Sequence, residues 1–455
     1  MGQILISAAN KSSGKTIVST GLCAALTSQG KIVQPFKKGP DYIDPMWLSV
    51  AAKRPCYNLD FWTQTEPEIV SCFSHNSGDA DISIIEANKG LYDGLALDGS
   101  NSNAALAKLL NTSVILVLDC RGTIRGIAPL LLGYQQFDPQ VNIAGIILNF
   151  VGGSRHEAKL RQVVETYTDI PVLGAIQRDD HLLVEERYLG LIPSNEDPHA
   201  LSKIQALGEN IAAQVDCQQI LACAAAIPKT QITDTAANHG HYPVRIAYAK
   251  DRAFGFYYAD DLDTFRAHGA ELIAFDTLHD SQLPSADALW LGGGFPEKCI
   301  TELHSNHAMR EDIHQKLSAG MPAYAECGGL MYLCENIHYQ SKCESMVGLI
   351  PAQCHMSERP QGRGYTQFKE NSHSLWSAPS DQLINAHEFH YSYLQNLDQH
   401  TPLSFDIMRG HGIDQKNDGI RINNTLACYA HQRHTQQNPW ISRFLKFVSE
   451  QAQWD

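Results

Sequence analysis

The opening of the chain constrains its fold most, because a strand, a glycine–lysine–threonine loop and a helix follow one another there. The apolar run Ile4–Ser7 predicts a buried strand, and Thr16–Gln29 predicts a helix closed by Gly30. In such a loop, backbone N–H groups and the helix N-terminus hold phosphate oxygens, the lysine neutralises charge, and the threonine hydroxyl faces Mg²⁺. Ala9 replaces the first glycine of the Walker A pattern, and an ordinary turn is the alternative. The residues predicted to bind a nucleotide are Asn10, Lys11, Ser12, Ser13, Gly14, Lys15 and Thr16.

The first half of the chain repeats this alternation of buried strands and helical patterns. Near-continuous apolar runs favour a parallel sheet covered on both faces, so a doubly wound α/β domain is predicted. The further strands expected are Ile32–Phe36, Ile82–Glu86, Val114–Asp119, Ala144–Asn149 and Val172–Ile176.

A change of composition predicts the domain boundary. The chain has 455 residues, enough for two or three domains, and a polar stretch at Thr233–His241 precedes a second α/β block. We expect a first domain at 1–225, a linker at 226–242 and a second domain at 243–455. The strands expected in the second block are Val244–Ala249, Leu272–Asp276, Ala288–Leu291 and Pro322–Ala325.

Charge and hydropathy limit the partners. The net charge is −14 and no long basic run occurs, which argues against nucleic acid and anionic membranes. Apolar runs are too short to span a bilayer, and no cationic leader precedes the first strand, so we expect a cytoplasmic protein. The twelve cysteines form no C-x-x-C pair, and most are expected to be buried reduced thiols.

Cys327 is the cysteine with a different context. The strand Pro322–Ala325 runs into Glu326-Cys327-Gly328-Gly329 and then into an apolar helix start, the arrangement of a nucleophile on a tight turn. The Gly328 N–H can serve an oxyanion, and the segment Leu291–Glu297 offers a second donor. A distant histidine should act as base, and His431 is the candidate. A buried cysteine in a glycine-rich turn is the alternative interpretation.

These motifs together resemble the cobyrinate a,c-diamide synthase family. That family joins a phosphate-loop domain of dethiobiotin-synthetase type to a class I glutamine amidotransferase domain of flavodoxin-like fold. The resemblance covers nearly the whole chain, and its most specific segments are Gln34–Asp44, Gly90–Gly94, Ala253–Tyr258, Gly292–Glu297, Glu326–Gly329 and His387–Ser392.

The resemblance implies a ligase that uses L-glutamine, ATP and Mg²⁺. A Cys327 thioester would release ammonia from glutamine, with His431 as base and Gly293 and Gly328 forming the oxyanion site. The first domain would convert a substrate carboxylate into an acyl phosphate, which ammonia then turns into an amide. By motif match, Thr16, Asp41 and Glu86 would hold the metal, while Asp44 and Tyr42 would orient the substrate.

The sequence departs from the family's pattern beside the base. Class I amidotransferases place a glutamate two residues after the histidine, but Arg433 stands there, within His431-Gln432-Arg433-His434. Ala87 replaces the glycine usual after the acidic strand end, and Asn88-Lys89 follow it. The third member of the glutaminase triad is therefore unassigned by sequence.

The acceptor is a tetrapyrrole polycarboxylate if the resemblance holds. Cobyrinate, amidated on its a and c acetates, is the main hypothesis, and sirohydrochlorin or siroheme is the alternative. Lys89, Arg121 and Arg125 could pair with ring carboxylates, or could equally be solvated charges. A homodimer is left open. A P-loop switch ATPase is the other class, but Asn10 stands where its signature lysine is expected, and glutaminase activity would exclude it.

Overall fold

A computed structural model describes residues 2–178, 186–187, 190–227, 240–376 and 380–451. The chain divides into two compact units, Met1–Asp234 and Thr235–Asp455. The division falls inside the segment expected as a linker, of which residues 228–239 lie outside the described part. Within the described ranges, no helix is long and apolar enough to cross a membrane.

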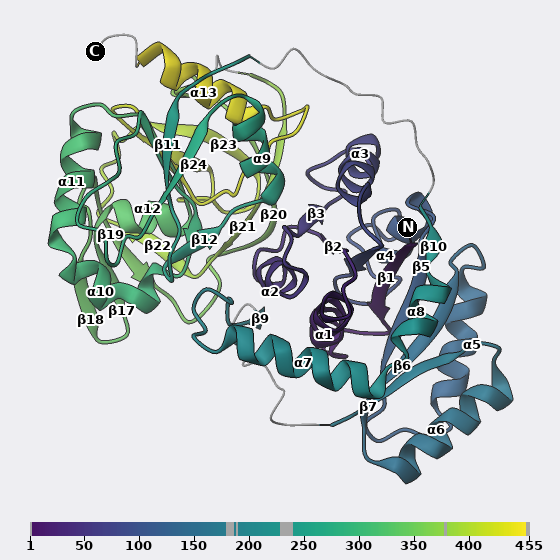
Figure 1. The fold of residues 1–455 in the computed structure, drawn as a ribbon. Helices are drawn as coiled ribbons and strands as arrows, with labels where there is room; N and C mark the ends of the chain where they lie inside the picture. Colours follow the sequence, from purple (N-terminus) through teal and green to yellow (C-terminus); the bar gives the residue numbers. More distant parts are fainter. Residues whose placement is uncertain (1, 179–185, 188–189, 228–239, 377–379, 452–455) are drawn as a thin grey trace. The chain divides into compact units, whose positions relative to one another are not determined.

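The first unit is built on a parallel sheet (Figure 1). Ile6 of the central strand β1 pairs with Glu86 on β4, and Lys37 on β2 pairs with the same glutamate from the other side. The register therefore places an acid, a lysine and the start of the phosphate loop at one edge. The order is β3 (Tyr57–Leu59), β2 (Val33–Lys38), β4 (Ile82–Glu86), β1 (Gly2–Ala8), β5 (Ser113–Asp119), β6 (Ile143–Val151) and β7 (Val172–Gln177), with β10 (Ala225–Ala226) antiparallel to β1.

Helices cover both faces of this sheet, as the doubly wound prediction requires. In Figure 1, α1 and α7 pack together on one face, and α5 and α6 pack together on the other. The short strands β8 (Glu186–Arg187) and β9 (Gly190–Leu191) pair antiparallel with each other. The helices are α1 (Lys15–Ser28), α2 (Ile43–Ala52), α3 (Glu66–Ser77), α4 (Asn103–Leu109), α5 (Ile127–Phe137), α6 (Ser154–Tyr167), α7 (Ala200–Gln214) and α8 (Cys217–Cys223).

The second unit has a nine-stranded sheet that is parallel on one side and antiparallel on the other. The parallel half contains the four expected strands, while the antiparallel half was not predicted. The order is β13 (Glu271–Phe275), β11 (Arg245–Ala249), β14 (Ala288–Leu291), β16 (Ala323–Glu326), β25 (Thr425–Cys428), β24 (Asn417–Ile422), β23 (Leu403–Arg409), β20 (Gly362–Glu370) and β21 (Ile384–His390).

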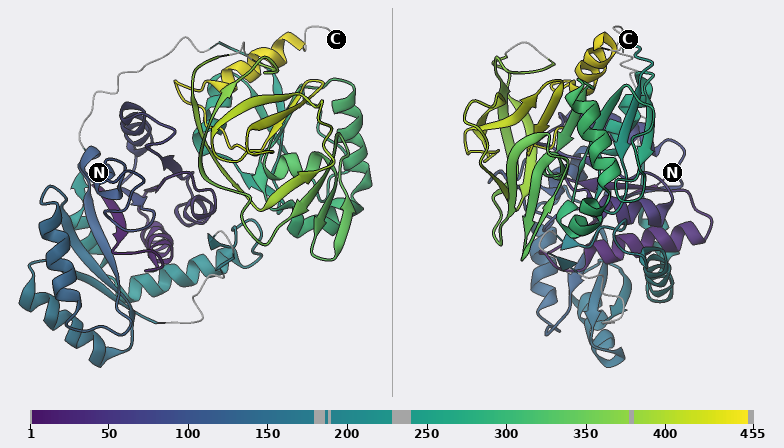
Figure 2. Two further views of the ribbon diagram at one scale, coloured as in Figure 1. Left: turned by 180° about the vertical axis from the view of Figure 1, so that it is seen from behind. Right: turned by 90° about the vertical axis from the view of Figure 1, so that its left-hand side faces the viewer.

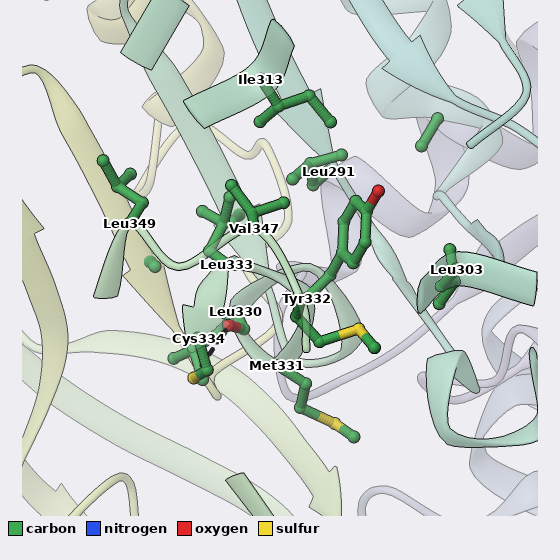
Figure 3. Packing of buried hydrophobic residues seen from close by; sticks show 14 of the residues in the cluster. Leu291, Leu303, Ile313, Leu330, Met331, Tyr332, Leu333, Cys334, Val347 and Leu349 are labelled. Atoms are coloured by element: carbon green, nitrogen blue, oxygen red, sulfur yellow. Dashed lines mark hydrogen bonds between the residues drawn. The ribbon is translucent and has the colours of Figure 1, made fainter. Parts of the chain in front are cut away.

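Alternating side chains of these strands pack into two separate hydrophobic cores, one on each face of the sheet. Leu289, Leu291 and Ala325 face one cluster, and Trp290 and Tyr324 face the other, as the two-residue period of a strand dictates. Figure 3 shows the first cluster, in which Leu330, Tyr332 and Leu333 pack near Leu291 and Ile313. The first cluster includes α10 (Ile300–Ser305), α11 (His307–Ser318) and α12 (Gly328–Leu333), and the second includes α9 (Ala259–Ala267) and α13 (Trp440–Gln451).

Smaller elements complete the second unit, whose ribbon is seen from two further directions in Figure 2. Several predicted boundaries were wrong by one or two residues: the second strand is Val33–Lys38 in place of Ile32–Phe36, and α1 starts at Lys15 in place of Thr16. The additional elements are β12 (Phe254–Phe256) with β15 (Gly293–Gly294), the 3-10 helix η2 (Pro296–Cys299), and a four-stranded sheet of β18 (Lys342–Ser345), β17 (Cys334–Tyr339), β19 (Ile350–Met356) and β22 (Ser392–Gln395).

Candidate active sites

The loop before α1 is held in shape by its own hydrogen bonds. Ser13 Oγ donates to Asn10 Oδ1 at 2.6 Å, and Asn149 Nδ2 donates to the Ser13 carbonyl at 2.9 Å. Gly14 precedes the helix at φ 84°, and a Cβ there would lie 2.2 Å from Asn149 Nδ2, so only glycine fits. Ala9 occupies the place of the missing glycine, and its carbonyl accepts from Tyr134 Oη at 2.7 Å. These contacts therefore hold the loop in one conformation ahead of the helix N-terminus.

Three predicted acidic residues meet around one lysine at this edge. Lys37 Nζ donates to Asp44 Oδ2 at 2.5 Å and to Glu86 Oε1 at 2.9 Å, and it lies 3.9 Å from Asp41 Oδ2. Thr16 Oγ1 also donates to Glu86 Oε1, at 2.6 Å. Thr16, Asp41, Asp44 and Glu86 are thus brought together as expected from the strand ends, and Lys37 is the member to which no role had been given.

Burial sets the charge state of this cluster. Burial raises the pKa of Glu86 to about 7, with Asp44 adding to the rise and Lys37 opposing it. Burial likewise raises the pKa of Asp41 to about 6. Burial would also raise the pKa of Asp44, but contact with Lys37 holds it below its ordinary value. Burial and the charge of Lys37 lower the pKa of Lys15 to about 8. The negative charge of an added phosphate would therefore stabilise the protonated form of Lys15.

The donor set fits Mg²⁺ shared with a nucleotide. Glu86 Oε2 is buried and makes no hydrogen bond among the described residues, which leaves a carboxylate oxygen for a hard cation beside the Thr16 hydroxyl. No cluster of three or more histidine, cysteine or acidic side chains in the described ranges is arranged to enclose a metal. Mg²⁺ commonly uses one or two carboxylates plus phosphates and waters, so this site suits it.

The predicted substrate residues lie on separate segments. Tyr42 is buried at the start of α2, and Lys89 adopts a left-handed backbone, φ 39°, just after β4. Arg121 pairs with Asp119 at 2.6 Å and lies over the Phe150 ring, and Arg125 lies over the Tyr167 ring. Both arginines are exposed and already engaged.

Cys327 occupies a strained turn between β16 and α12. Its backbone has φ 47° and ψ −98°, a region that non-glycine residues rarely adopt, and its N–H donates to the Cys428 carbonyl at 2.8 Å. A Cβ on Gly328 would lie 3.0 Å from the Gly294 N and O atoms, and one on Gly329 would lie 2.4 Å from the Leu291 carbonyl oxygen. The glycines therefore let the turn approach the neighbouring backbone closely.

His431 lies beside this turn because β25 pairs with β16 and leads directly to it. Its Nδ1 is 3.4 Å from Glu326 Oε2, and its ring stacks on that of His387 with 4.8 Å between centroids. A Cβ on Gly293 would lie 2.6 Å from His431 Cε1, so Gly293 lies against the imidazole. Cys327, His431, Gly293 and Gly328 are thus gathered at one place, as the sequence predicted.

Electrostatics at His431 favour its charged form. Burial alone would lower the pKa of His431, but contacts with Cys327 and Glu326 outweigh burial and raise it to about 10. Burial keeps the pKa of His387 well below its ordinary value, so the stacked partner is neutral. Asp418 accepts from the N–H groups of Tyr429 and Ala430 at 3.0 and 2.9 Å, which fixes the backbone leading to the base. A charged imidazole beside a cysteine suits a thiolate nucleophile.

Comparison with known proteins agrees with both sites. Residues 4–191 match the CobQ/CobB/MinD/ParA nucleotide binding domain, and residues 245–439 match the CobB/CobQ-like glutamine amidotransferase domain. The cobyrinate a,c-diamide synthase of Magnetococcus marinus is 42% identical over 452 residues, covering 97% of each chain. The chain belongs to this family. The synthases of Methanosarcina acetivorans and Dehalococcoides mccartyi (strain CBDB1) are 39% and 37% identical, covering 94% and 97% of this chain and 92% and 96% of their own.

As a member of the cobyrinate a,c-diamide synthase family, the chain is an amide-forming ligase with a glutamine amidotransferase domain. The expected glutamate after the histidine is replaced by Arg433, which is fully buried. Its Nη2 donates to Asp260 Oδ2 at 2.7 Å, and its guanidinium lies over the Tyr258 ring. In this family member, therefore, that position holds a buried arginine paired with a half-buried aspartate.

Sequence reasoning missed Lys37, Asn149 and Glu326. Lys37 lies within the segment Gln34–Asp44, and its only signal was its place directly after the strand expected at Ile32–Phe36, close to predicted acids. Glu326 directly precedes the cysteine, but its approach to His431 depends on the pairing of β16 with β25. Asn149 ends the strand expected at Ala144–Asn149 and reaches the loop 136 residues earlier.

Proposed function

We propose that the chain is a cobyrinate a,c-diamide synthase that uses ATP, Mg²⁺ and L-glutamine to convert the a and c acetate carboxylates of cobyrinate into amides. The observation that carries the proposal is the likeness along 97% of the chain to a relative of that name. The two separate sites support it, since each contains the groups that one half of such a reaction requires.

The second unit would generate ammonia. The imidazolium of His431 holds the proton given up by Cys327, and the Cys327 thiolate attacks the side-chain amide carbon of glutamine, forming a C–S bond as the C=O π bond opens. The N–H groups of Gly293 and Gly328 would donate hydrogen bonds to the negative oxygen of the tetrahedral intermediate. His431 then gives its proton to the amide nitrogen, the C–N bond breaks, and ammonia leaves. Water, deprotonated by His431, attacks the thioester and releases glutamate and the thiol.

The first unit would activate the acceptor. A ring carboxylate oxygen attacks the γ-phosphorus of ATP, the bond to the β-phosphate oxygen breaks, and an acyl phosphate and ADP result. Lys15 and the loop N–H groups hold the phosphates, while Thr16 and Glu86 would hold Mg²⁺, which neutralises charge on the phosphates. Ammonia then attacks the acyl carbon, phosphate leaves, and loss of a proton completes the amide.

Two substitutions distinguish the ammonia-forming reaction of the second unit from the acyl-phosphate reaction of the first. Lys15→Ala is expected to lose amidation from both glutamine and ammonium, because the acyl phosphate cannot form. Cys327→Ala is expected to lose only glutamine-dependent amidation, since high ammonium replaces the ammonia source. The exposed Lys159→Ala and Cys343→Ala serve as matched controls. Amidation at wild-type rate by Lys15→Ala, or loss of both activities in folded Cys327→Ala, would contradict the two-step mechanism.

The ring is tested with three acceptors. The protein is incubated with ATP, Mg²⁺, glutamine and, separately, cobyrinate, sirohydrochlorin and siroheme, and product masses count each exchange of OH for NH₂. Two exchanges on cobyrinate, at the highest kcat/KM of the three, are expected. Exchange confined to a siro-ring would overturn the choice of acceptor and leave the ligase chemistry intact.

A further inference from the structure

The glutaminase site contains a carboxylate at the base that does not come from the usual position. We propose that Glu326, the residue directly before the nucleophile, positions and charge-balances His431, in place of the glutamate that class I amidotransferases carry two residues after the histidine. This inference rests on the glutaminase half of the proposed function and adds a positioning residue to it.

The two oxygens of Glu326 have different partners. Oε1 accepts from Tyr324 Oη, on the same strand, at 2.6 Å and from the N–H of Gln432, in the segment after β25, at 2.9 Å, so two hydrogen bonds anchor the carboxylate. Oε2 lies 3.4 Å from His431 Nδ1, and both side chains are only 3% exposed. The separation is that of a loose contact, as catalytic hydrogen bonds often are before substrate binds. One oxygen thus fixes the group while the other faces the base.

The strand geometry explains why this residue reaches the histidine. Side chains alternate along β16, so Glu326 lies on the face of Tyr324 and opposite to Ala325. Glu326 pairs in register with Cys428 on β25, and the chain reaches His431 three residues later. Glu326 therefore points to the side of the sheet on which the segment after β25 places His431.

Other charged groups around the imidazole do not perform this role. Burial keeps His387, which stacks on the ring, neutral. Arg433 is cationic and pairs with Asp260 at 2.7 Å, so neither of these two balances an imidazolium. The thiol of Cys327 is the proton donor of the reaction. Glu326 is the carboxylate in contact with His431 among the described residues.

A carboxylate at Nδ1 has two chemical consequences. Once the 3.4 Å contact tightens to hydrogen-bond length, the carboxylate would accept the Nδ1–H and leave Nε2 as the basic nitrogen for the Cys327 proton. It also stabilises the imidazolium that forms when the thiolate is generated. Removing the charge while keeping the shape should therefore weaken the thiolate–imidazolium pair without removing either catalytic residue.

The experiment compares Glu326→Gln, Glu326→Asp and Glu370→Gln in the full-length protein. Glu370 is a matched control, since it is also buried and pairs with Arg443 at 2.5 Å. Alkylation of Cys327 by iodoacetamide is followed from pH 5 to 10 by mass spectrometry, alongside glutamine- and ammonium-dependent amidation. Circular dichroism checks folding.

We expect Glu326→Gln to lower glutamine-dependent kcat by about 100-fold and to shift the pH profile of alkylation, with ammonium-dependent amidation retained. Glu326→Asp should give an intermediate profile, which also decides the question if the glutamine variant does not fold. Wild-type profiles in the glutamate variants, or the same shift in Glu370→Gln, would overturn the proposal. Full glutaminase activity in Cys327→Ala would instead overturn the proposed function, so the two failures are distinguishable.

Discussion

Glu86 offers a direct test of the electrostatics at the phosphate site. Its pKa rises from an ordinary 4.5 to about 7 in the folded protein, and the side chain is only 1% exposed. The folded state therefore binds more protons than the unfolded state between these values, and the free energy of unfolding falls as pH rises through that window. The full loss, reached above pH 7, is about 3 kcal/mol.

Glu86→Gln removes this titration while keeping the shape of the side chain. Packing and hydrogen-bond changes act at every pH, so they offset the two stabilities by a constant. The difference between variant and wild type should therefore move by about 2–3 kcal/mol in favour of the variant from pH 5 to pH 8.5. Without the charge, we also expect weaker binding of ATP with Mg²⁺.

The assay is urea unfolding at pH 5, 7 and 8.5 in metal-free buffer. Pulsed hydrogen exchange of peptides from β1 and β4 reports on the first unit alone. Glu165→Gln, on the exposed face of α6, is the control and should keep the pH dependence of the wild type. A difference between Glu86→Gln and wild type that does not change with pH would refute the reasoning.

Three further substitutions test local geometry. Cys327→Gly should be about 1 kcal/mol more stable to thermal unfolding than Cys327→Ala, because only glycine adopts φ 47° without strain; equal stability would argue against strain. Asp260→Ala should lower the free energy of urea unfolding by about 2 kcal/mol, because it removes the half-buried carboxylate to which the buried Arg433 guanidinium donates; an unchanged free energy would contradict this. Gly14→Ala should abolish nucleotide binding in calorimetry, since its methyl group would collide with Asn149; wild-type affinity would show that the loop adapts.

The first unit was largely predictable because its signals are local. Apolar runs such as Val114–Asp119 mark buried parallel strands, and the loop motif fixes which strand is β1. The predicted start of β2 was wrong by one residue, since Ile32 is as apolar as Val33 and the sequence does not show which of the two begins the strand pairing. Carboxylates at strand ends were expected at one edge, and the register of β2, β4 and β1 places them there.

The antiparallel half of the second sheet was not predictable in the same way. Strands such as β20 bury the polar Thr366 and Glu370 beside Phe368, so the alternation of apolar and polar residues that marks a half-buried strand is missing from their sequence. Their pairing joins segments far apart in the chain. The contact of Glu326 with His431 belongs to the same class, since it spans 105 residues of sequence and depends on how β25 returns beside β16.

The contents of each unit have an evolutionary consequence. Cys327, Glu326 and His431 all belong to residues 235–455, and the phosphate loop and its acids all belong to residues 1–234. In the proposed reaction, the ammonia that the second unit releases is the same whatever molecule accepts it. The second unit can therefore be inherited unchanged while the acceptor varies. Selection for a different ring should therefore change residues of the first unit. Splitting the gene near residue 235 would separate the two units and would keep each set of reactive groups on one chain.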